Sequence, residues 1–565
     1  MSGPVKVDVL VVGSGAAGLS AAVTAAMHGA SVMVAEKASV LGGTSAWSGG
    51  WLWIPRNTLA RAEGIDEAAD APLTYLQHEM GGEAADIRLQ TFLRYGPEMV
   101  EFFHQRTAVQ FLSGSAMPDF HPSPGAANGG RSVTAHPYDG RLLGDWLHRL
   151  RPPLETISLG GMGIAGGADM AHFFNATRSP RSALYAARRL LRHGWQRLRA
   201  GRGQHLVNGN ALVARLLRSA LDAGVRFQLN APVVRLLQGP PGVSGAVLRS
   251  DSGEIHVEAG AVVLACGGFP HDRQRLAQVV PHAAEGYGHF SAAPPDNQGE
   301  GIRLGESVGG QFDTSLRHPL AWAPVSRVTL ASGQQLMFPH LVERAKPGVI
   351  AVLPNGKRFV NEADSYHDFI AALLAATPAG DTPQAWLLAD RRALRRYGLG
   401  HARPFPFTPT AWLRTGYLQR GNTLAELAKQ CAIDANALAE TVERFNHFAS
   451  TGEDVDFHRG ASAYNRAQGD HQVTLGPLRE GPFYAVRILP GSLGTFSGLQ
   501  TDEHARVLDE QQQPIPGLYA IGNDMSSVMR GYYPSGGITL GPAMTFGYLV
   551  GKNLAKKTNI NNNIT

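Results

Sequence analysis

The first strong pattern along the chain is an apolar run, a glycine turn and an apolar helix within residues 6–36. Residues 7–12, VDVLVV, are almost continuously apolar, which is typical of a strand buried on both faces. The following GSGAAGLSAAVTAAMHG predicts a helix that starts after the glycines and ends at Gly29. A second apolar run, ASVMVAE, ends at Glu36. This order predicts a βαβ unit with two parallel strands.

The rest of the chain predicts an α/β protein in two parts. Strand patterns at residues 225–266 predict a β-meander that rejoins the first unit, and residues 143–203 predict a helical insertion. The helix patterns TLAELAKQCA and DANALAETVERFNHFA lie in the middle of the chain. We therefore expect a Rossmann-like domain from residues 1–274 and 486–565, with an inserted α+β substrate or capping domain at 275–485.

Composition narrows the class of protein. The chain has 565 residues, of which 44% are hydrophobic and 17% charged, so it can bury a large core. It has two cysteines, Cys266 and Cys431, which excludes a disulfide framework and a cysteine-ligated metal cluster, and we expect no metal site. The first apolar run belongs to a strand, and no long uncharged apolar stretch follows. We expect a cytoplasmic protein.

The net charge of +5 is concentrated in residues 178–202, which hold eight arginines and no acid. The remainder of the chain is close to neutral, which argues against a nucleic-acid partner. Two interpretations of the segment stay open. It is either a solvated helical insertion or a basic, partly apolar surface that contacts anionic lipid at the inner membrane surface.

The glycine turn carries a dinucleotide-binding pattern. Gly13, Gly15 and Gly18 form G-x-G-x-x-G between a predicted strand and a predicted helix. The turn, with Ala16 and Ala17, brings backbone N–H groups at the helix start towards a pyrophosphate. Glu36, followed by Lys37, ends the second strand, where an acid hydrogen-bonds a ribose hydroxyl and disfavours a 2′-phosphate.

The next glycine-rich stretch, GGTSAWSGG at residues 42–50, identifies the dinucleotide. It resembles the second FAD motif of the fumarate reductase and succinate dehydrogenase flavoprotein superfamily, and LACGGF (264–269) and LYAIGND (518–524) resemble strands that close the FAD site. The resemblance implies FAD as cofactor. It assigns further FAD-binding positions at Gly42, Gly43, Thr44, Ser45, Ser48, Gly49, Gly50, Val233, Gly267, Gly268, Asn523, Asp524, Gly537, Ile538 and Leu540.

The C-terminal sequence MRGYYPSGGITLGPAMTFGYLVGK resembles the FAD-dependent 3-ketosteroid dehydrogenases, which introduce a double bond beside a ring ketone. Tyr533 and Gly537 match the Tyr and Gly of that motif. NGKRFVNEADSYHDF (355–369) and LGTFSGLQTDEHARVLD (493–509) also resemble this family. By this resemblance Tyr366 is the base that removes the α proton.

The chemistry requires such groups independently of the family. Removal of an α proton beside a ketone needs two donors at the carbonyl oxygen, where enolate charge develops. The Tyr533 hydroxyl and the Gly537 N–H are the expected donors. The phenol of Tyr366 has an ordinary pKa near 10, so it needs a lowered pKa or a proton relay to act as base.

One position departs from the steroid family, whose enzymes use a further tyrosine in the N-terminal part. The matching stretch, MPDFHPSPGAANGGRS, has Phe120 instead. Tyr138, Tyr185 and Tyr532 are candidates for the assisting role. The substrate is therefore a 3-ketosteroid or a small cyclic ketone such as a cyclohexanone derivative, with an electron acceptor that stays unidentified.

Two other functions are weaker alternatives. A soluble fumarate-type reductase would need cationic clamps for two carboxylates, and the loop YYPSGG has no cation, although Arg344 and Arg358 remain available. A non-catalytic flavin electron carrier would need no substrate domain, whereas residues 275–485 predict one.

Overall fold

The structure is a computed structural model that describes residues 4–240, 242–283, 288–330 and 332–562. Within these residues the larger sheet has eight strands in the order β19-β20-β11-β1-β2-β8, with β10 on β11 and β9 on β10. Its strands are β1 (Val5–Val12), β2 (Val32–Ala35), β8 (Arg226–Gln228), β9 (Val233–Gly239), β10 (Gly242–Ser250), β11 (Gly253–Leu264), β19 (Arg506–Leu508) and β20 (Pro514–Ala520).

The centre of this sheet is parallel and buried. β1 pairs in parallel with both β2 and β11, which confirms the predicted βαβ unit. β9, β10 and β11 pair antiparallel in sequence order, which confirms the predicted β-meander. β20 pairs in parallel with β11, so a strand from the end of the chain completes the sheet begun at its start.

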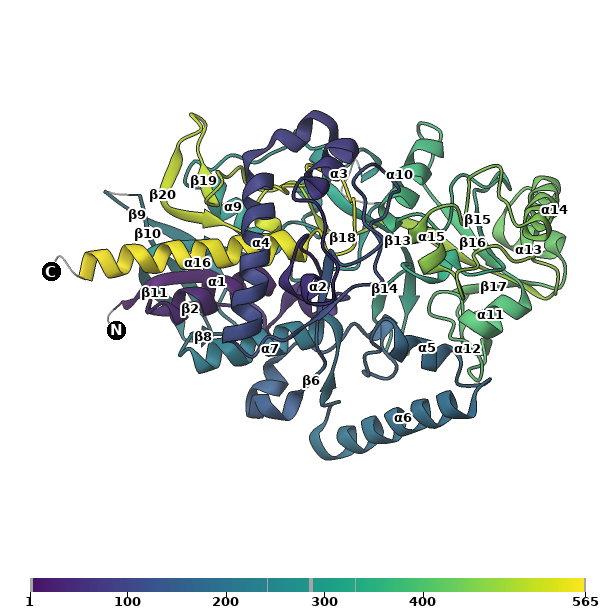
Figure 1. Cartoon of the computed structure of the whole chain (residues 1–565), viewed down its shortest axis with the longest axis horizontal. Helices are drawn as coiled ribbons and strands as arrows, with labels where there is room; N and C mark the ends of the chain where they lie inside the picture. The colour runs from purple at the N-terminus through teal and green to yellow at the C-terminus, as the bar shows by residue number, and fades with distance from the viewer. Residues whose placement is uncertain (1–3, 241, 284–287, 331, 563–565) are drawn as a thin grey trace.

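A group of four helices packs beside this sheet (Figure 1). α1 (Ala16–Met27) packs against α16 (Leu540–Asn562) and α7 (Asn208–Asp222), and α4 (Ile87–Arg106) packs on α16. α1 is nearly all small apolar residues, ten of which are buried, because it lies between the sheet and two other helices. The small sheets beside it contain β3 (Trp51–Trp53), β4 (Phe111–Ser113), β5 (Ser132–Ala135), β6 (Tyr138–Asp139) and β7 (His205–Leu206).

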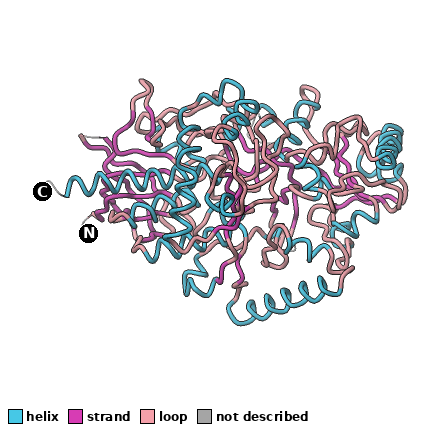
Figure 2. Tube along the Cα trace, in the orientation of Figure 1, coloured by secondary structure: helices cyan, strands magenta, loops and turns pink. Residues whose placement is uncertain are grey.

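A second sheet lies at the other end of the molecule (Figure 2). In the described part of the chain it has seven strands around β18 (Phe483–Thr495), which pairs with β12, β13, β16 and β17. The other strands are β12 (Phe290–Ser291), β13 (Leu320–Thr329), β14 (Gln335–Pro339), β15 (Val349–Val352), β16 (Ala385–Ala389) and β17 (Leu418–Gly421). The α/β fold class is confirmed, whereas the domain boundaries stay a prediction.

The remaining helices surround the second sheet or extend the first. The predicted helices at 423–432 and 434–449 are present as α13 and α14. The α-helices are α2 (Thr58–Ala62), α3 (Ala71–Met80), α5 (Ala168–Phe174), α6 (Pro180–Ala200), α8 (Arg273–Val279), α9 (Glu300–Glu306), α10 (Tyr366–Ala376), α11 (Arg391–Tyr397), α12 (Thr410–Arg414), α13 (Leu424–Cys431), α14 (Ala435–Thr451) and α15 (Ala463–Gln468). The 3-10 helices are η1 (Gly43–Trp47), η2 (Gly81–Ala85), η3 (Gly140–Arg149), η4 (Glu155–Ile157), η5 (Pro281–Ala283), η6 (Glu343–Ala345) and η7 (Gly522–Asp524).

The insertion expected to be helical over residues 143–203 is helical only in part. Helix is present at η3, η4, α5 and α6, but most of residues 150–167 are loop. Pro152 and Pro153 remove backbone donors, and five glycines between 160 and 167 disfavour a helix. α6 therefore stands apart as one long helix along the edge of the molecule (Figure 1).

Candidate active site

A cavity of about 1870 Å³ runs from the glycine turn of the first sheet to the helices around the second. Pockets for one small molecule measure about 300–1,000 Å³, so this cavity has room for a dinucleotide and a substrate together. We call the part lined by residues 12–17 and 35–50 the dinucleotide end. The part lined by Phe120, Tyr366, Tyr464, Tyr533 and Gly537 is the carbonyl end.

The turn at the dinucleotide end requires glycine. Gly13 has φ +109°, and a Cβ atom there would lie 2.2 Å from the carbonyl oxygen of Ala265. The chain at the end of β1 can therefore pass close to the end of β11 and continue directly into α1. Ala16 and Ala17, the first residues of that helix, line the cavity, where the first helical turn directs N–H groups and the positive end of the helix dipole.

Glu36 lies at the end of β2 in the cavity wall. Its carboxylate accepts hydrogen bonds from the Ser14 N–H (3.1 Å), the Ser14 hydroxyl (2.6 Å) and the Ala38 N–H (2.9 Å). These bonds fix the acid beside the glycine turn. The neighbouring Lys37 pairs with Glu300 of α9.

Most residues assigned to FAD by resemblance line this cavity. They are Gly13, Gly15, Ala16, Ala17, Glu36, Lys37, Gly43, Thr44, Ser45, Ser48, Gly49, Gly50, Val233, Gly267, Asn523, Gly537 and Leu540. Gly18, Gly42, Gly268, Asp524 and Ile538 are not among the described lining residues. Asp524 instead accepts the N–H groups of Cys266 (2.6 Å) and Gly268 (3.0 Å), and burial raises its pKa to about 6. Asp524 therefore stabilises the turn after β11 without lining the cavity itself.

These features fit FAD. The close approach at Gly13 leaves the helix start open to a pyrophosphate, Glu36 is fixed where a ribose hydroxyl binds, and residues 43–50 continue the wall towards the carbonyl end. In contrast, the described residues contain no group of three or more His, Cys, Asp or Glu side chains that could hold a metal ion.

Gly537 is held at the carbonyl end by β3. Its carbonyl oxygen accepts the N–H of Trp53 at 3.1 Å, and a Cβ atom at its φ of +102° would lie 2.6 Å from that same nitrogen. The Gly537 N–H donates to no acceptor among the described residues. A backbone donor is therefore free at this point of the cavity wall.

Tyr533 is 5% exposed and lies among aromatic rings. Its ring stacks on Phe120 at 5.8 Å and meets the edge of Tyr366 at 5.0 Å. The Tyr533 hydroxyl lies near those of Tyr366 and Thr539, and both neighbours affect the pKa of the Tyr533 phenol. Burial raises the pKa of Tyr533 to about 12, so it stays a neutral donor at physiological pH.

Tyr366 is the first residue of α10. Ser365 caps this helix by accepting the N–H of Asp368 at 3.1 Å, which fixes the direction in which Tyr366 leaves the backbone. Burial and the neighbouring Tyr533 raise the pKa of Tyr366 well above 10, while the positive charge of Arg344 acts in the opposite direction. Arg344 is itself 2% exposed and donates to backbone carbonyls, including that of Asp364.

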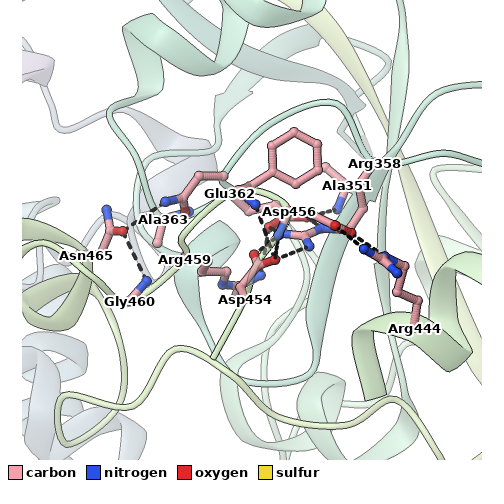
Figure 3. A network of polar contacts seen from close by, with 12 residues as sticks. Ala351, Arg358, Glu362, Ala363, Arg444, Asp454, Asp456, Arg459, Gly460 and Asn465 are labelled. Carbon is pink, nitrogen blue, oxygen red and sulfur yellow. Dashed lines mark hydrogen bonds and ion pairs between the residues drawn. The ribbon is translucent and has the colours of Figure 1, made fainter. Parts of the chain in front are cut away.

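A buried ion-pair network supports the segment before Tyr366 (Figure 3). The Glu362 carboxylate accepts from Arg358 at 2.7 Å and from Arg459 at 3.0 Å, and Arg358 also donates to Asp454 at 2.9 Å. Although burial opposes ionisation, the two guanidinium groups lower the pKa of Glu362 to about 2. The network joins β15, the segment before α10 and the loop after α14.

Sequence reasoning missed Tyr464, which lines the carbonyl end from α15. It is 2% exposed, and its ring lies 4.4 Å from Phe120. Burial raises its pKa strongly, whereas Arg344 acts to lower it. The next residue, Asn465, donates to Asp364 at 2.9 Å and so joins α15 to the segment that carries Tyr366. No motif surrounds Tyr464, because α15 is only six residues long.

The three candidates for an assisting tyrosine lie elsewhere. Tyr138 has Arg215 over its ring at 5.0 Å, Tyr185 donates to Asp169 at 2.8 Å, and Tyr532 has Arg317 over its ring at 5.0 Å. None of the three is among the described lining residues. Phe120, the position that departs from the steroid family, lies at the centre of the carbonyl end in contact with Tyr366, Tyr464 and Tyr533.

Comparison with known proteins identifies the family of the chain. The FAD binding domain family matches residues 8–540. A 4-oxocyclohex-2-ene-1-carboxylate 5-dehydrogenase from Sinomonas cyclohexanicum is 39% identical over 97% of this chain and 94% of its own length. A 3-oxosteroid 1-dehydrogenase from Mycolicibacterium smegmatis is 35% identical over 97% of both chains.

A solved structure is also closely similar. It is the 3-ketosteroid Δ1-dehydrogenase from Sterolibacterium denitrificans in complex with 1,4-androstadiene-3,17-dione, with a TM-score of 0.88 and 36% identity over 98% of this chain and 100% of that chain. The chain therefore belongs to the FAD-binding family of ketosteroid and cyclic-ketone dehydrogenases, which confirms both the predicted family and FAD as its cofactor.

Proposed function

We propose that this chain is an FAD-dependent dehydrogenase that introduces an α,β double bond beside a ring ketone, in the manner of a 3-ketosteroid 1-dehydrogenase. The observation that carries the proposal is the carbonyl end itself. There Tyr533 and Gly537, whose N–H is free, border one cavity, and Tyr366 lines the same cavity with its ring in edge contact with Tyr533.

Tyr533 and Gly537 are the donors to the ketone oxygen. As the α proton leaves, negative charge develops on that oxygen, and two fixed donors in a water-poor site stabilise it. The high pKa of Tyr533 suits this role, because the phenol keeps its proton while it donates. When bound, FAD supplies the acceptor for the hydride that leaves the β carbon.

Tyr366 is the base for the α proton. Its environment holds the phenol protonated at rest, since burial raises its pKa, so the proton must move as the substrate reacts. To act as base, the phenol must first give its proton to solvent, and the positive charge of Arg344 favours the phenolate that then accepts the α proton.

A fumarate-type reductase is disfavoured because the two arginines considered for binding its substrate carboxylates have other partners. Arg358 is engaged by Glu362 and Asp454, and Arg344 donates to backbone carbonyls. Neither is among the described lining residues. The carbonyl end is aromatic, which suits one ketone oxygen and an apolar ring better than two carboxylates.

Anaerobic titration of the holoenzyme with ring ketones tests the function. We expect 4-oxocyclohexanecarboxylate or androst-4-ene-3,17-dione to bleach the flavin absorbance without an added acceptor. Tyr533→Phe should lower the rate of bleaching by about 10²–10³-fold, the usual cost of losing one such donor, while FAD stays bound. Full-rate bleaching by Tyr533→Phe would refute the donor role, and no bleaching by any ketone would refute the function.

We also propose that α6 contacts an anionic membrane surface. Leu184, Leu191, Trp195 and Leu198 lie on one face of this helix and are 73%, 76%, 56% and 85% exposed. Arg189 pairs with Asp169, whereas the exposed arginines of this helix form no ion pair with any other described residue. The inner face of the same helix, at Ala183, Ala186 and Leu190, lines the cavity. No helix in the described ranges has the length and apolarity needed to span a bilayer.

Sedimentation with vesicles tests the contact. The protein should pellet with phosphatidylglycerol vesicles, less with phosphatidylcholine vesicles, and less again at high salt because exposed charges are screened. Leu191→Glu with Trp195→Glu should abolish pelleting, whereas Ile87→Glu, at an exposed apolar site on α4, should not. Equal pelleting by the double variant would exclude α6 as the contact.

A further inference from the structure

Lys346 is a buried cation in the cavity wall without a carboxylate partner. It follows η6, is 8% exposed and lines the cavity. Its ammonium group donates to the carbonyl oxygens of Gln468 at 2.5 Å and Gly469 at 2.7 Å. Among the described residues, no acid forms an ion pair with it. An ammonium group has three donors, so one is left for a ligand.

The two acids nearest to Lys346 are already engaged. Glu343 bonds to His340 at 2.5 Å, and Asp470 pairs with Arg396 and accepts from the Tyr397 hydroxyl at 2.7 Å. They act on Lys346 only at longer range, and burial lowers its pKa to about 8. The Lys346 ammonium group therefore lies in the cavity wall with no carboxylate of a described residue in direct contact with it.

This charge lies close to the carbonyl end. Lys346 binds the last carbonyl of α15, and Tyr464 is four residues earlier on the same helix, which corresponds to about 6 Å along its axis. Tyr464 packs on Phe120, which stacks on Tyr533. Lys346 and the donors of the carbonyl end therefore border the same cavity, and Tyr464 and Phe120 lie between them along this series of contacts.

We propose that Lys346 binds a carboxylate of the substrate, so that the preferred substrate is a ring ketone that carries a carboxylate group. The inference rests on the proposed function, and it assigns the substrate group that binds at Lys346 in the same cavity. A ketosteroid without a carboxylate would leave the ammonium group unpaired in a buried wall, whereas a carboxylate forms a charge-assisted hydrogen bond with its free donor.

The test compares 4-oxocyclohexanecarboxylate with its methyl ester in the holoenzyme at pH 7. Wild-type enzyme should prefer the acid. Lys346→Met should raise KM for the acid by about 10–100-fold, the effect of one hydrogen bond to a charged group, and leave KM for the ester unchanged. Lys346→Arg should retain most of the preference. Lys357→Met removes an exposed cation outside the cavity and should change neither constant.

A second measurement does not depend on turnover. Calorimetry with cyclohexanecarboxylate, which has no ketone, should detect binding to wild-type holoenzyme and weaker binding to Lys346→Met. Equal KM values for acid and ester in wild-type enzyme would overturn the proposal, as would a higher kcat/KM for androst-4-ene-3,17-dione than for the keto acid. These outcomes leave the dehydrogenase function intact, whereas failure of all ketones to bleach the flavin would remove the function itself.

Discussion

The dinucleotide end of the cavity is built from short stretches of consecutive residues, whereas the carbonyl end is assembled from side chains far apart in the sequence. Residues 13–17 and 43–50 supply most of the first end through backbone and small side chains. The second end takes its aromatic groups from Phe120, Tyr366, Tyr464 and Tyr533. The first end can therefore be described by a short sequence motif, whereas the second exists only once distant segments have folded together.

The sharpest test of this difference is Tyr366→Phe, which changes only the carbonyl end. Loss of the base should reduce kcat and the exchange of substrate α hydrogens by about 10²–10⁴-fold, because the variant lacks the phenol hydroxyl that lies beside Tyr533 in the cavity wall. Exchange is measured by NMR in deuterated water, and flavin absorbance should be unchanged. Continued exchange at the wild-type rate would identify a different base.

Glu362→Gln should be the next largest effect, on stability. It leaves Arg459 buried without its carboxylate, which costs about 3–5 kcal/mol. The folded pKa of Glu362 is about 2, below its unfolded value of about 4.3, so its stabilisation is present above that value and is lost as the pH falls from about 4.5 towards 2. Urea titrations at pH 7 and pH 3 measure both effects, and a difference between the two proteins that is the same at both pH values would contradict the ion pair.

Gly13→Ala should affect the opposite end of the cavity. A Cβ atom at position 13 would lie 2.2 Å from the Ala265 carbonyl and needs a strained backbone. We expect FAD affinity to fall by about tenfold or more, corresponding to about 1–3 kcal/mol of strain. Flavin fluorescence after dilution measures the affinity. A variant that retains FAD as tightly as wild type would show that the turn can relax.

Tyr464→Phe should have the smallest effect. Its ring would still pack on Phe120, so only the hydroxyl near the proton path is lost. We expect a three- to tenfold reduction in kcat, within the lower part of the range for proton-transfer groups, with KM little changed. Stopped-flow reduction of the flavin measures it, with Tyr185→Phe on α6 as control. An unchanged rate would leave Tyr464 a packing residue.

The same difference explains which parts of the molecule could be predicted from sequence. The βαβ unit, the meander and the FAD turn follow from apolar periodicity and glycine spacing within about thirty residues. Tyr533 and Gly537 were found because they share one short motif. The extent of helix in residues 143–203 was overestimated, since two prolines and several glycines outweigh the apolar spacing there.

Tyr464 and Lys346 could not be found in this way. Each lies in a short element with no motif around it, and each reaches the cavity only because the second sheet folds its segment against the first. Tyr138, Tyr185 and Tyr532 were reasonable candidates by residue type. Their contacts are with Arg215, Asp169 and Arg317, respectively, and none of the three tyrosines is among the described lining residues. Long-range packing decides these positions, and local sequence carries little information about it.

Phe120 also affects how much deuterium label the substrate retains during turnover. Its ring occupies the space between Tyr366, Tyr464 and Tyr533, and a benzyl side chain carries no exchangeable hydrogen. A deuteron taken from a labelled ketone onto the base would therefore be shielded from bulk water on this side, and it would return to the same carbon whenever hydride departure is delayed. Substrate recovered part-way through turnover should keep more of its label than free diffusion of the proton would allow.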